Sequence, residues 1–158
     1  MAHGQVSQEL VFVTTIYGAN YLPFLAPHLY SVSRCHPGTT ELVLWQDLPQ
    51  HEIDLLSMGF HHCEFSRIEE PIEGSIHQRI GRKLCAWGTS CKLYPDNPLC
   101  FIDCDTLLVR PLGEFFTNDF DILFTWKDEV FPINTGVLLT RNGRIGNEFF
   151  QEWVRRVE

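Results

Sequence analysis

Apolar positions along the chain fall into two kinds of pattern, short continuous runs and stripes with helical spacing. The continuous runs are rich in β-branched and aromatic residues and predict strands, whereas the stripes predict helices. The predicted strands cover 9–15, 41–45, 61–68, 99–104, 121–126 and 134–140. The predicted helices cover 20–36, 51–60, 75–94 and 145–158. Because apolar strands alternate with helices, the pattern predicts an α/β protein with a mainly parallel sheet covered on both faces.

Length and composition indicate a single domain that spans 1–158. The chain has 158 residues, of which 44% are apolar and 20% are charged, which suits a globular protein with a sizeable core. No apolar run approaches the length of about 18 residues that a membrane span requires, so no span is expected. The amino-terminal segment lacks the basic and apolar regions of a signal peptide, and the expected location is therefore the cytoplasm.

The charge of the chain restricts its partners. A formal net charge of −8 argues against a nucleic-acid partner, because such binding depends on Lys and Arg that neutralise phosphates. A small phosphorylated ligand stays possible, since a few cationic groups or a metal ion suffice to hold it.

The chain contains six cysteines, but none has the C-x-x-C spacing of a zinc ribbon or a thioredoxin-type redox site. Most of them are expected to be small buried apolar residues in a reducing compartment. His61 and His62 precede Cys63, and such a cluster suggests a metal site. Neighbouring residues of a strand point to opposite faces, however, so these three are interpreted as ordinary surface and core residues.

Two aspartates, Asp103 and Asp105, stand where the predicted core strand at 99–104 ends. Residues two apart in an extended chain point the same way, so both carboxylates can reach one point. Their repulsion is costly unless a cation, a proton or phosphate chemistry compensates it. Because α/β sheets bind ligands at the carboxyl ends of their strands, the pair predicts a hard divalent cation whose coordination is completed by phosphate oxygens.

Two other interpretations bear on this motif. Asp119 and Asp121 repeat the D-x-D pattern, but they precede their predicted strand and are interpreted as a solvated turn. Haloacid-dehalogenase-type phosphohydrolases also end a strand with acidic residues followed by Thr-Leu, where the first Asp is a nucleophile and the second a general acid/base. The stretch 103–108 lacks the glycine of that motif and its Thr is shifted by one place, so this alternative ranks lower.

Four ordered segments together resemble the GT-A glycosyltransferases, most closely the glycogenin-like family-8 branch. The segments are FVTTIYGANYLPFL (12–25), GRKLCAW (81–87), FIDCDTLLVRPLGEFF (101–116) and FPINTGVLL (131–139). The resemblance covers nearly the whole chain and implies the Rossmann-like GT-A fold, with a mixed, mostly parallel sheet flanked by helices. It further implies a UDP-sugar donor, a bound Mn²⁺ (or Mg²⁺) and a carbohydrate or glycosylated acceptor.

The resemblance assigns donor-binding roles position by position. The positions that match the family's uracil- and ribose-binding residues are Thr14, Thr15, Tyr17 and Tyr21. Hydroxyls and an aromatic face at the end of a strand suit a nucleoside. Lys83 matches a helix lysine that lies against the donor, and Arg79, one turn earlier, is expected to join it. Cys104, between the two aspartates, is counted with the donor-binding residues.

The resemblance also assigns the catalytic and metal-binding roles. Asp103 and Asp105 are implied metal ligands, and Asn134 matches a loop residue that contacts the donor sugar. Gly136 lets the backbone pass close to the ligand. The implied catalytic residues are Asp103, Asp105, Asn134 and Lys83. The implied reaction transfers a hexose, glucose or galactose, with retention of anomeric configuration, and the metal ion stabilises the departing diphosphate.

The chain departs from the family pattern at its carboxyl-terminal side. The family's third protein ligand is a histidine that follows the N-x-G loop, whereas all seven histidines here lie at or before His77. The expected domain therefore lacks acceptor-binding elements, as a short GT-A protein or as the donor-binding portion of a longer enzyme. Three hypotheses follow: a glycosyltransferase, a nucleotide-sugar-binding module with only slow donor hydrolysis, and, ranked last of these, the phosphohydrolase.

Overall fold

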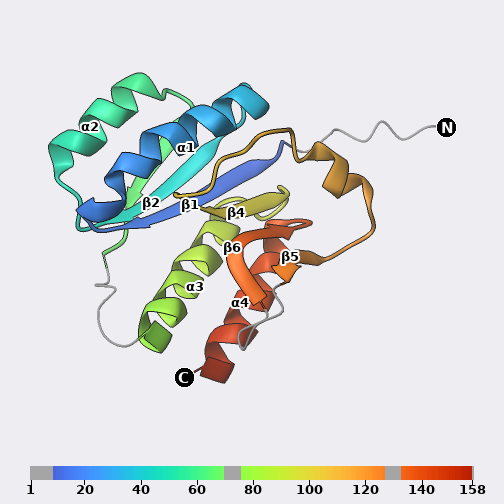
Figure 1. Ribbon diagram of the computed structural model, residues 1–158. Helices are drawn as coiled ribbons and strands as arrows, with labels where there is room; N and C mark the ends of the chain where they lie inside the picture. Colours follow the sequence, from blue (N-terminus) through green and yellow to red (C-terminus); the bar gives the residue numbers. More distant parts are fainter. Residues whose placement is uncertain (1–8, 70–75, 127–132, 158) are drawn as a thin grey trace.

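A six-stranded sheet forms the middle layer of the protein, with helices on both of its faces (Figure 1). The computed structural model describes residues 9–69, 76–126 and 133–157. The strands are β1 (Val11–Tyr17), β2 (Glu41–Gln46), β3 (Cys63–Arg67), β4 (Leu99–Asp103), β5 (Ile122–Trp126) and β6 (Ile133–Thr140). The α-helices are α1 (Leu22–Cys35), α2 (Gln50–Gly59), α3 (Ile76–Leu93) and α4 (Gly143–Val157). Two short 3-10 helices, η1 (Ala19–Tyr21) and η2 (Gly113–Thr117), lie between these elements.

The strands lie in the order β3-β2-β1-β4-β6-β5. The pairs formed by β1 with β2 and β4, and by β2 with β3, are parallel, while β6 is antiparallel to both β4 and β5. This arrangement confirms the predicted α/β class and the mixed, mostly parallel sheet. The chain leaves β1 toward β2 and β3, and then returns to place β4 on the other side of β1. In an open α/β sheet, ligands bind beside the carboxyl ends of the two strands at such a reversal.

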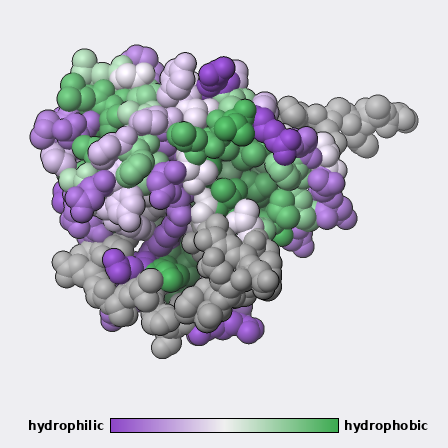
Figure 2. Space-filling model, viewed as in Figure 1, coloured by the Kyte–Doolittle hydropathy of each residue, from purple (hydrophilic) through white to green (hydrophobic). Residues whose placement is uncertain are grey.

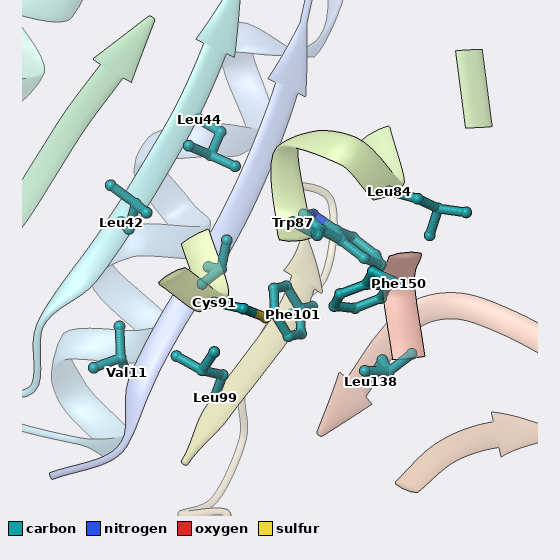
Figure 3. Packing of buried hydrophobic residues seen from close by; sticks show 11 residues of the cluster. Val11, Leu42, Leu44, Leu84, Trp87, Cys91, Leu99, Phe101, Leu138 and Phe150 are labelled. Carbon is teal, nitrogen blue, oxygen red and sulfur yellow. The ribbon is translucent and has the colours of Figure 1, made fainter. Parts of the chain in front are cut away.

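Alternation of side chains along the strands separates two apolar layers. Val13 of β1 belongs to a cluster with side chains of α3 and α4, whereas Ile16 belongs to a cluster with side chains of α1 and α2. Figure 3 shows the first cluster, in which three fully buried aromatic side chains gather where α3, β4 and α4 meet. They are Trp87, Phe101 and Phe150, with ring centroids 4.9–5.5 Å apart.

Helix α4 begins directly against the end of α3. A Cβ atom at Gly143 would collide with the carbonyl oxygens of Cys91 and Tyr94, so this contact requires glycine. The close approach places α4 beside α3 and covers the half of the sheet that contains β4.

The structure adjusts several predicted boundaries. Strand β4 ends at Asp103, so Cys104 belongs to the following turn and not to the strand. All six cysteines are free thiols, but only Cys91, Cys100 and Cys104 are buried, so the expectation that most of the six are buried is wrong. Among the helices in the described ranges, none has the length and apolar character that a bilayer span requires.

Candidate functional site

A pocket of about 470 Å³ lies at the carboxyl ends of β1 and β4, where the strand order reverses. Its walls come from the end of β1, from η1, from the first half of α3 and from the turn that follows β4. The described residues that line it are Thr15, Tyr17, Tyr21, Arg79, Ile80, Lys83, Asp103, Cys104 and Asp105. Residues from three separate segments of the sequence (15–21, 79–83 and 103–105) therefore meet in one cavity.

The turn after β4 brings both aspartates of the motif to this pocket. Asp103 is the last residue of β4, and its carbonyl accepts a hydrogen bond from the backbone N–H of Thr106 at 3.0 Å. Asp105 lies inside the turn closed by this bond and is exposed, whereas Asp103 is partly buried. Cys104 between them packs into the apolar cluster beneath α1 and α2. The pocket consequently receives two carboxylates from a tightly closed turn.

Helix α3 supplies positive charge opposite these carboxylates. Lys83 Nζ donates to Asp103 Oδ1 at 2.5 Å, and it also lies 4.5 Å from the centroid of the Trp87 ring. The Trp87 indole N–H in turn donates to Thr15 Oγ1 at 2.8 Å. Arg79, one helical turn before Lys83, lines the same pocket. This chain of contacts fixes the relative positions of β1, α3 and β4 around the cavity.

Tyr17 places a phenol group beside the carboxylates. Its burial, together with the negative charge of Asp103, raises the pKa of the Tyr17 hydroxyl well above its usual range. The hydroxyl is buried and has no hydrogen-bond partner among the described residues. Such a group is costly to bury unpaired, and it stays protonated at neutral pH. Tyr17 can therefore donate a hydrogen bond to a ligand in the pocket.

The turn after β1 presents a second tyrosine to the pocket. Gly18 has a φ of 75°, a left-handed conformation that favours glycine, and its N–H donates to the carbonyl of Gln46 at 3.0 Å. The 3-10 helix η1 follows immediately, and its last residue, Tyr21, is 48% exposed. An aromatic face that is half open to solvent suits stacking with a planar base.

Thr14 does not lie in this pocket, although it was expected beside Thr15. Because the two residues are neighbours in β1, they point to opposite faces of the sheet, and only Thr15 faces α3. Thr14 is fully buried beneath α1, where its hydroxyl donates to Glu41 Oε1 at 2.7 Å and lies 2.8 Å from His28 Nε2. Thr14 thus belongs to an internal polar cluster.

The other two expected residues, Asn134 and Gly136, lie in β6. Ile102 is paired with Val137 in the antiparallel register of β4 and β6, so the start of β6 lies at the edge of the sheet where β4 ends. Gly136 is not among the residues that line the pocket. The side chain of Asn134 lies outside the described part of the structure.

Helix α1 holds the segment that follows the acidic turn. His28 Nδ1 donates to the carbonyl of Thr106 at 2.6 Å, and Ser31 Oγ accepts from the backbone N–H of Leu108 at 3.0 Å. The contacts between α1 with its cap and this segment are His28–Thr106, Ser31–Leu108, Cys35–Leu108 and His36–Leu112. Figure 2 shows apolar surface over this part of the molecule, where Leu107 and Val109 are exposed. The backbone after Asp105 is thus held in place while some of its side chains face solvent.

His28 is itself held by a fully buried carboxylate. Its Nε2 lies 2.9 Å from Glu41 Oε1, and both side chains have no exposed surface. Burial lowers the pKa of His28, but the hydrogen bond and charge of Glu41, the Thr106 carbonyl and the charge of Asp103 outweigh burial and raise it above its ordinary value. Sequence patterns did not reveal this pair, because His28 occupies the apolar stripe of α1 and Glu41 opens an apolar strand.

The oxygen atoms that could act as metal ligands in the pocket suit a hard divalent cation. Carboxylate oxygens from Asp103 and Asp105 are the ligands that Mg²⁺ and Mn²⁺ prefer, and the open side of the pocket leaves room for phosphate and water oxygens. Lys83 already neutralises part of the charge on Asp103, which leaves Asp105 as the carboxylate with no ion pair among the described residues. The second D-x-D pair differs, because Asp119 is 97% exposed and pairs with Arg141.

No protein-family model matches the sequence, and no curated protein matches it either. Solved structures do match the fold. Galactosyltransferase LgtC, solved in complex with donor and acceptor sugar analogues, matches 94% of this chain with a TM-score of 0.67 and 16% sequence identity. GlyE, a glycosyltransferase of Streptococcus pneumoniae, matches 95% with a TM-score of 0.62 and 18% identity. The bifunctional glycosyltransferase WbbM matches 98% with a TM-score of 0.67 and 14% identity.

These matches show that the chain has the GT-A fold found in glycosyltransferases. The chain spans 66% of the length of LgtC, 38% of GlyE and 35% of WbbM. The fold expected from the four sequence segments is therefore confirmed, over a part of the length of each of these structures.

Proposed function

We propose that this chain is the donor-binding and catalytic part of a metal-dependent glycosyltransferase that uses a UDP-sugar. One observation carries the proposal: two carboxylates and two cationic side chains converge in a pocket at the point where the strand order of a GT-A fold reverses. A nucleoside diphosphate with a divalent cation complements this mixture of charges, since the cation suits the carboxylates and the diphosphate suits Lys and Arg.

In this proposal different residues of the pocket bind different parts of the UDP-sugar donor. Tyr21 stacks on the uracil, while Thr15 and the unpaired hydroxyl of Tyr17 hydrogen-bond the nucleoside. Lys83 and Arg79 bind the diphosphate, and Lys83 keeps its contact with Asp103 because an ammonium group has three donors. The side chains in these roles all line the cavity, but the buried hydroxyl of Tyr17 reaches the nucleoside only after a local rearrangement.

Asp103 and Asp105 would hold Mn²⁺, or Mg²⁺, together with phosphate oxygens. When bound, the cation supplies positive charge that stabilises the diphosphate as it leaves the sugar. Lys83 adds a positive charge beside Asp103, and the contact of its ammonium group with the Trp87 ring holds it in that position. Asn134, at the start of β6 on the same sheet edge, contacts the sugar in this proposal, and the transfer of glucose or galactose retains the anomeric configuration.

A second candidate is a nucleotide-sugar-binding module with only slow donor hydrolysis. It is favoured by one observation, that the polar side chains that line the pocket are all accounted for by binding of the donor and its metal ion. The phosphohydrolase hypothesis has no support from the structural matches described above, which are glycosyltransferases.

A screen of UDP- and GDP-sugars with Mn²⁺ distinguishes the two candidates. The enzyme hypothesis predicts that one UDP-hexose is consumed at least about tenfold faster when a panel of sugar acceptors is added. Consumption that no acceptor accelerates would support the binding module. Preference for GDP-sugars, or no Mn²⁺-dependent consumption at all, would contradict the proposed enzyme.

A further inference from the structure

A second group of side chains that can bind a metal lies at the amino-terminal ends of the parallel strands. The pocket proposed to bind the UDP-sugar, called the donor pocket below, lies at their carboxyl ends. Glu41 is the first residue of β2 and Cys63 the first residue of β3, and the two are paired in the parallel register. His62 lies in the turn just before β3, and its carbonyl accepts the backbone N–H of Glu41 at 3.3 Å. One ligand atom from each of these three side chains lies within 4.8 Å of the other two.

Two of these side chains carry buried polar atoms that lack a partner. Glu41 Oε1 interacts with His28 and Thr14, but Glu41 Oε2 has no hydrogen-bond partner among the described residues, and neither has His62 Nε2. A buried carboxylate oxygen and a buried imidazole nitrogen are each costly when left unpaired. Both atoms belong to residues of the same cluster, so a single cation bound between these residues would provide a partner for each.

We propose that Glu41, His62 and Cys63 form a zinc-binding site. A thiolate, an imidazole and a carboxylate are the ligand types that proteins use for Zn²⁺, and a borderline-soft metal is selected by the sulfur atom. The Cys63 thiol releases its proton to solvent as the metal binds. Water is the fourth ligand, and the half-buried positions of His62 and Cys63 give it access.

The geometry requires only a modest contraction. Ligand atoms around a tetrahedral zinc ion lie about 3.5 Å apart, given metal–ligand distances of about 2.0–2.3 Å. The limit of 4.8 Å on the present separations means that the longest shortens by about 1.3 Å at most. His62 lies in a surface turn, so its ring can make this movement while Glu41 stays fixed by His28 and Thr14.

The sequence pattern did not predict this site, because it placed the start of the strand too early. A strand that begins at residue 61 would point His62 and Cys63 to opposite faces, but β3 begins only at Cys63. Because β3 is the edge strand of the sheet, a metal ion here would tie the edge strand to β2. The site lies at the amino-terminal ends of these parallel strands, far from the chemistry of the donor pocket, so its role is structural.

Zinc analysis of the full chain tests this site. The measurement uses an Asp105→Asn background, so that the donor pocket does not contribute, and zinc is quantified after dialysis. About one equivalent is expected. Cys63→Ser and His62→Asn should each lower the zinc content at least about fivefold. His61→Asn, which changes the exposed neighbour in the same turn, should retain it.

Cobalt provides a second readout that does not depend on affinity for zinc alone. Co²⁺ bound at this site should show a near-ultraviolet thiolate charge-transfer band, which Cys63→Ser abolishes and His61→Asn preserves. Far-ultraviolet circular dichroism checks that each variant is folded, and His62→Asn provides the test if Cys63→Ser does not fold. Absence of bound zinc in the Asp105→Asn chain, or zinc content unchanged by both ligand variants, would overturn the proposal.

Discussion

Replacing His28 with leucine tests the buried ion pair that lies beneath the acidic turn. The substitution removes the imidazole that interacts with Glu41 Oε1 at 2.9 Å and with the carbonyl of Thr106 at 2.6 Å. Glu41 keeps only the hydroxyl of Thr14 at its Oε1 atom, while its side chain remains fully buried. The variant therefore leaves a carboxylate in the core without its cation.

The magnitude follows from the burial of both partners. Removing one member of a buried ion pair costs about 3–5 kcal/mol, because the remaining charge has neither water nor a counter-ion. That is a large part of the total stability of a domain, which is typically about 5–15 kcal/mol. Replacing both residues removes the charge problem, so His28→Leu/Glu41→Leu should recover at least the about 3–5 kcal/mol lost in His28→Leu.

Urea denaturation followed by tryptophan fluorescence measures these differences, with EDTA present so that no metal ion contributes. Since the folded pKa of His28 lies above its unfolded value, its contribution is complete below about pH 6.5 and falls as the pH rises through the folded pKa. The free energy of unfolding of the wild type, taken relative to that of the double variant, should therefore be higher at acidic than at alkaline pH. A loss below about 1 kcal/mol in His28→Leu, or a double variant as unstable as the sum of both single variants, would refute the reasoning.

Three further substitutions probe the pocket. Trp87→Phe removes the indole N–H that donates to Thr15 and should lower the free energy of unfolding by about 1–3 kcal/mol in urea, and an unchanged value would contradict this contribution. Tyr17→Phe removes an unpaired buried hydroxyl, so the free energy of unfolding should stay equal or rise, while calorimetry shows UDP binding about tenfold weaker. Lys83→Gln should weaken UDP binding at least about tenfold, whereas Lys92→Gln, in the last turn of the same helix, should leave the affinity unchanged. Equal effects of the two lysine variants would show that Lys83 has no special role.

The sequence was sufficient for the architecture because local patterns determine it. Apolar runs interrupted by helical stripes predicted, within a few residues, each of the six strands and four α-helices that the described residues form, and the acidic pair pointed to the carboxyl end of β4. The expected position of Thr14 in the pocket was wrong. Thr14 and Thr15 are neighbours in one strand, so their side chains point to opposite faces of the sheet.

Local sequence patterns could not predict contacts between segments that are far apart in the sequence. His28 and Glu41 are 13 residues apart and belong to a helix and a strand, so only the folded chain shows that they pair. The same holds for Trp87 and Thr15, which are 72 residues apart. Whether His62 lies in a strand or in the turn before it depends on one residue of strand length, which hydrophobic patterns do not resolve.

Calorimetric titration of UDP with and without Mn²⁺ tests most directly whether the acidic pair binds a metal–nucleotide complex. The wild type should bind UDP at least about tenfold more tightly with Mn²⁺ than with EDTA. Asp105→Asn should lose this difference, whereas Asp119→Asn, which changes the exposed second D-x-D pair, should retain it. UDP binding that is indifferent to Mn²⁺, or an Asp105→Asn chain that keeps the full metal dependence, would contradict the proposed function.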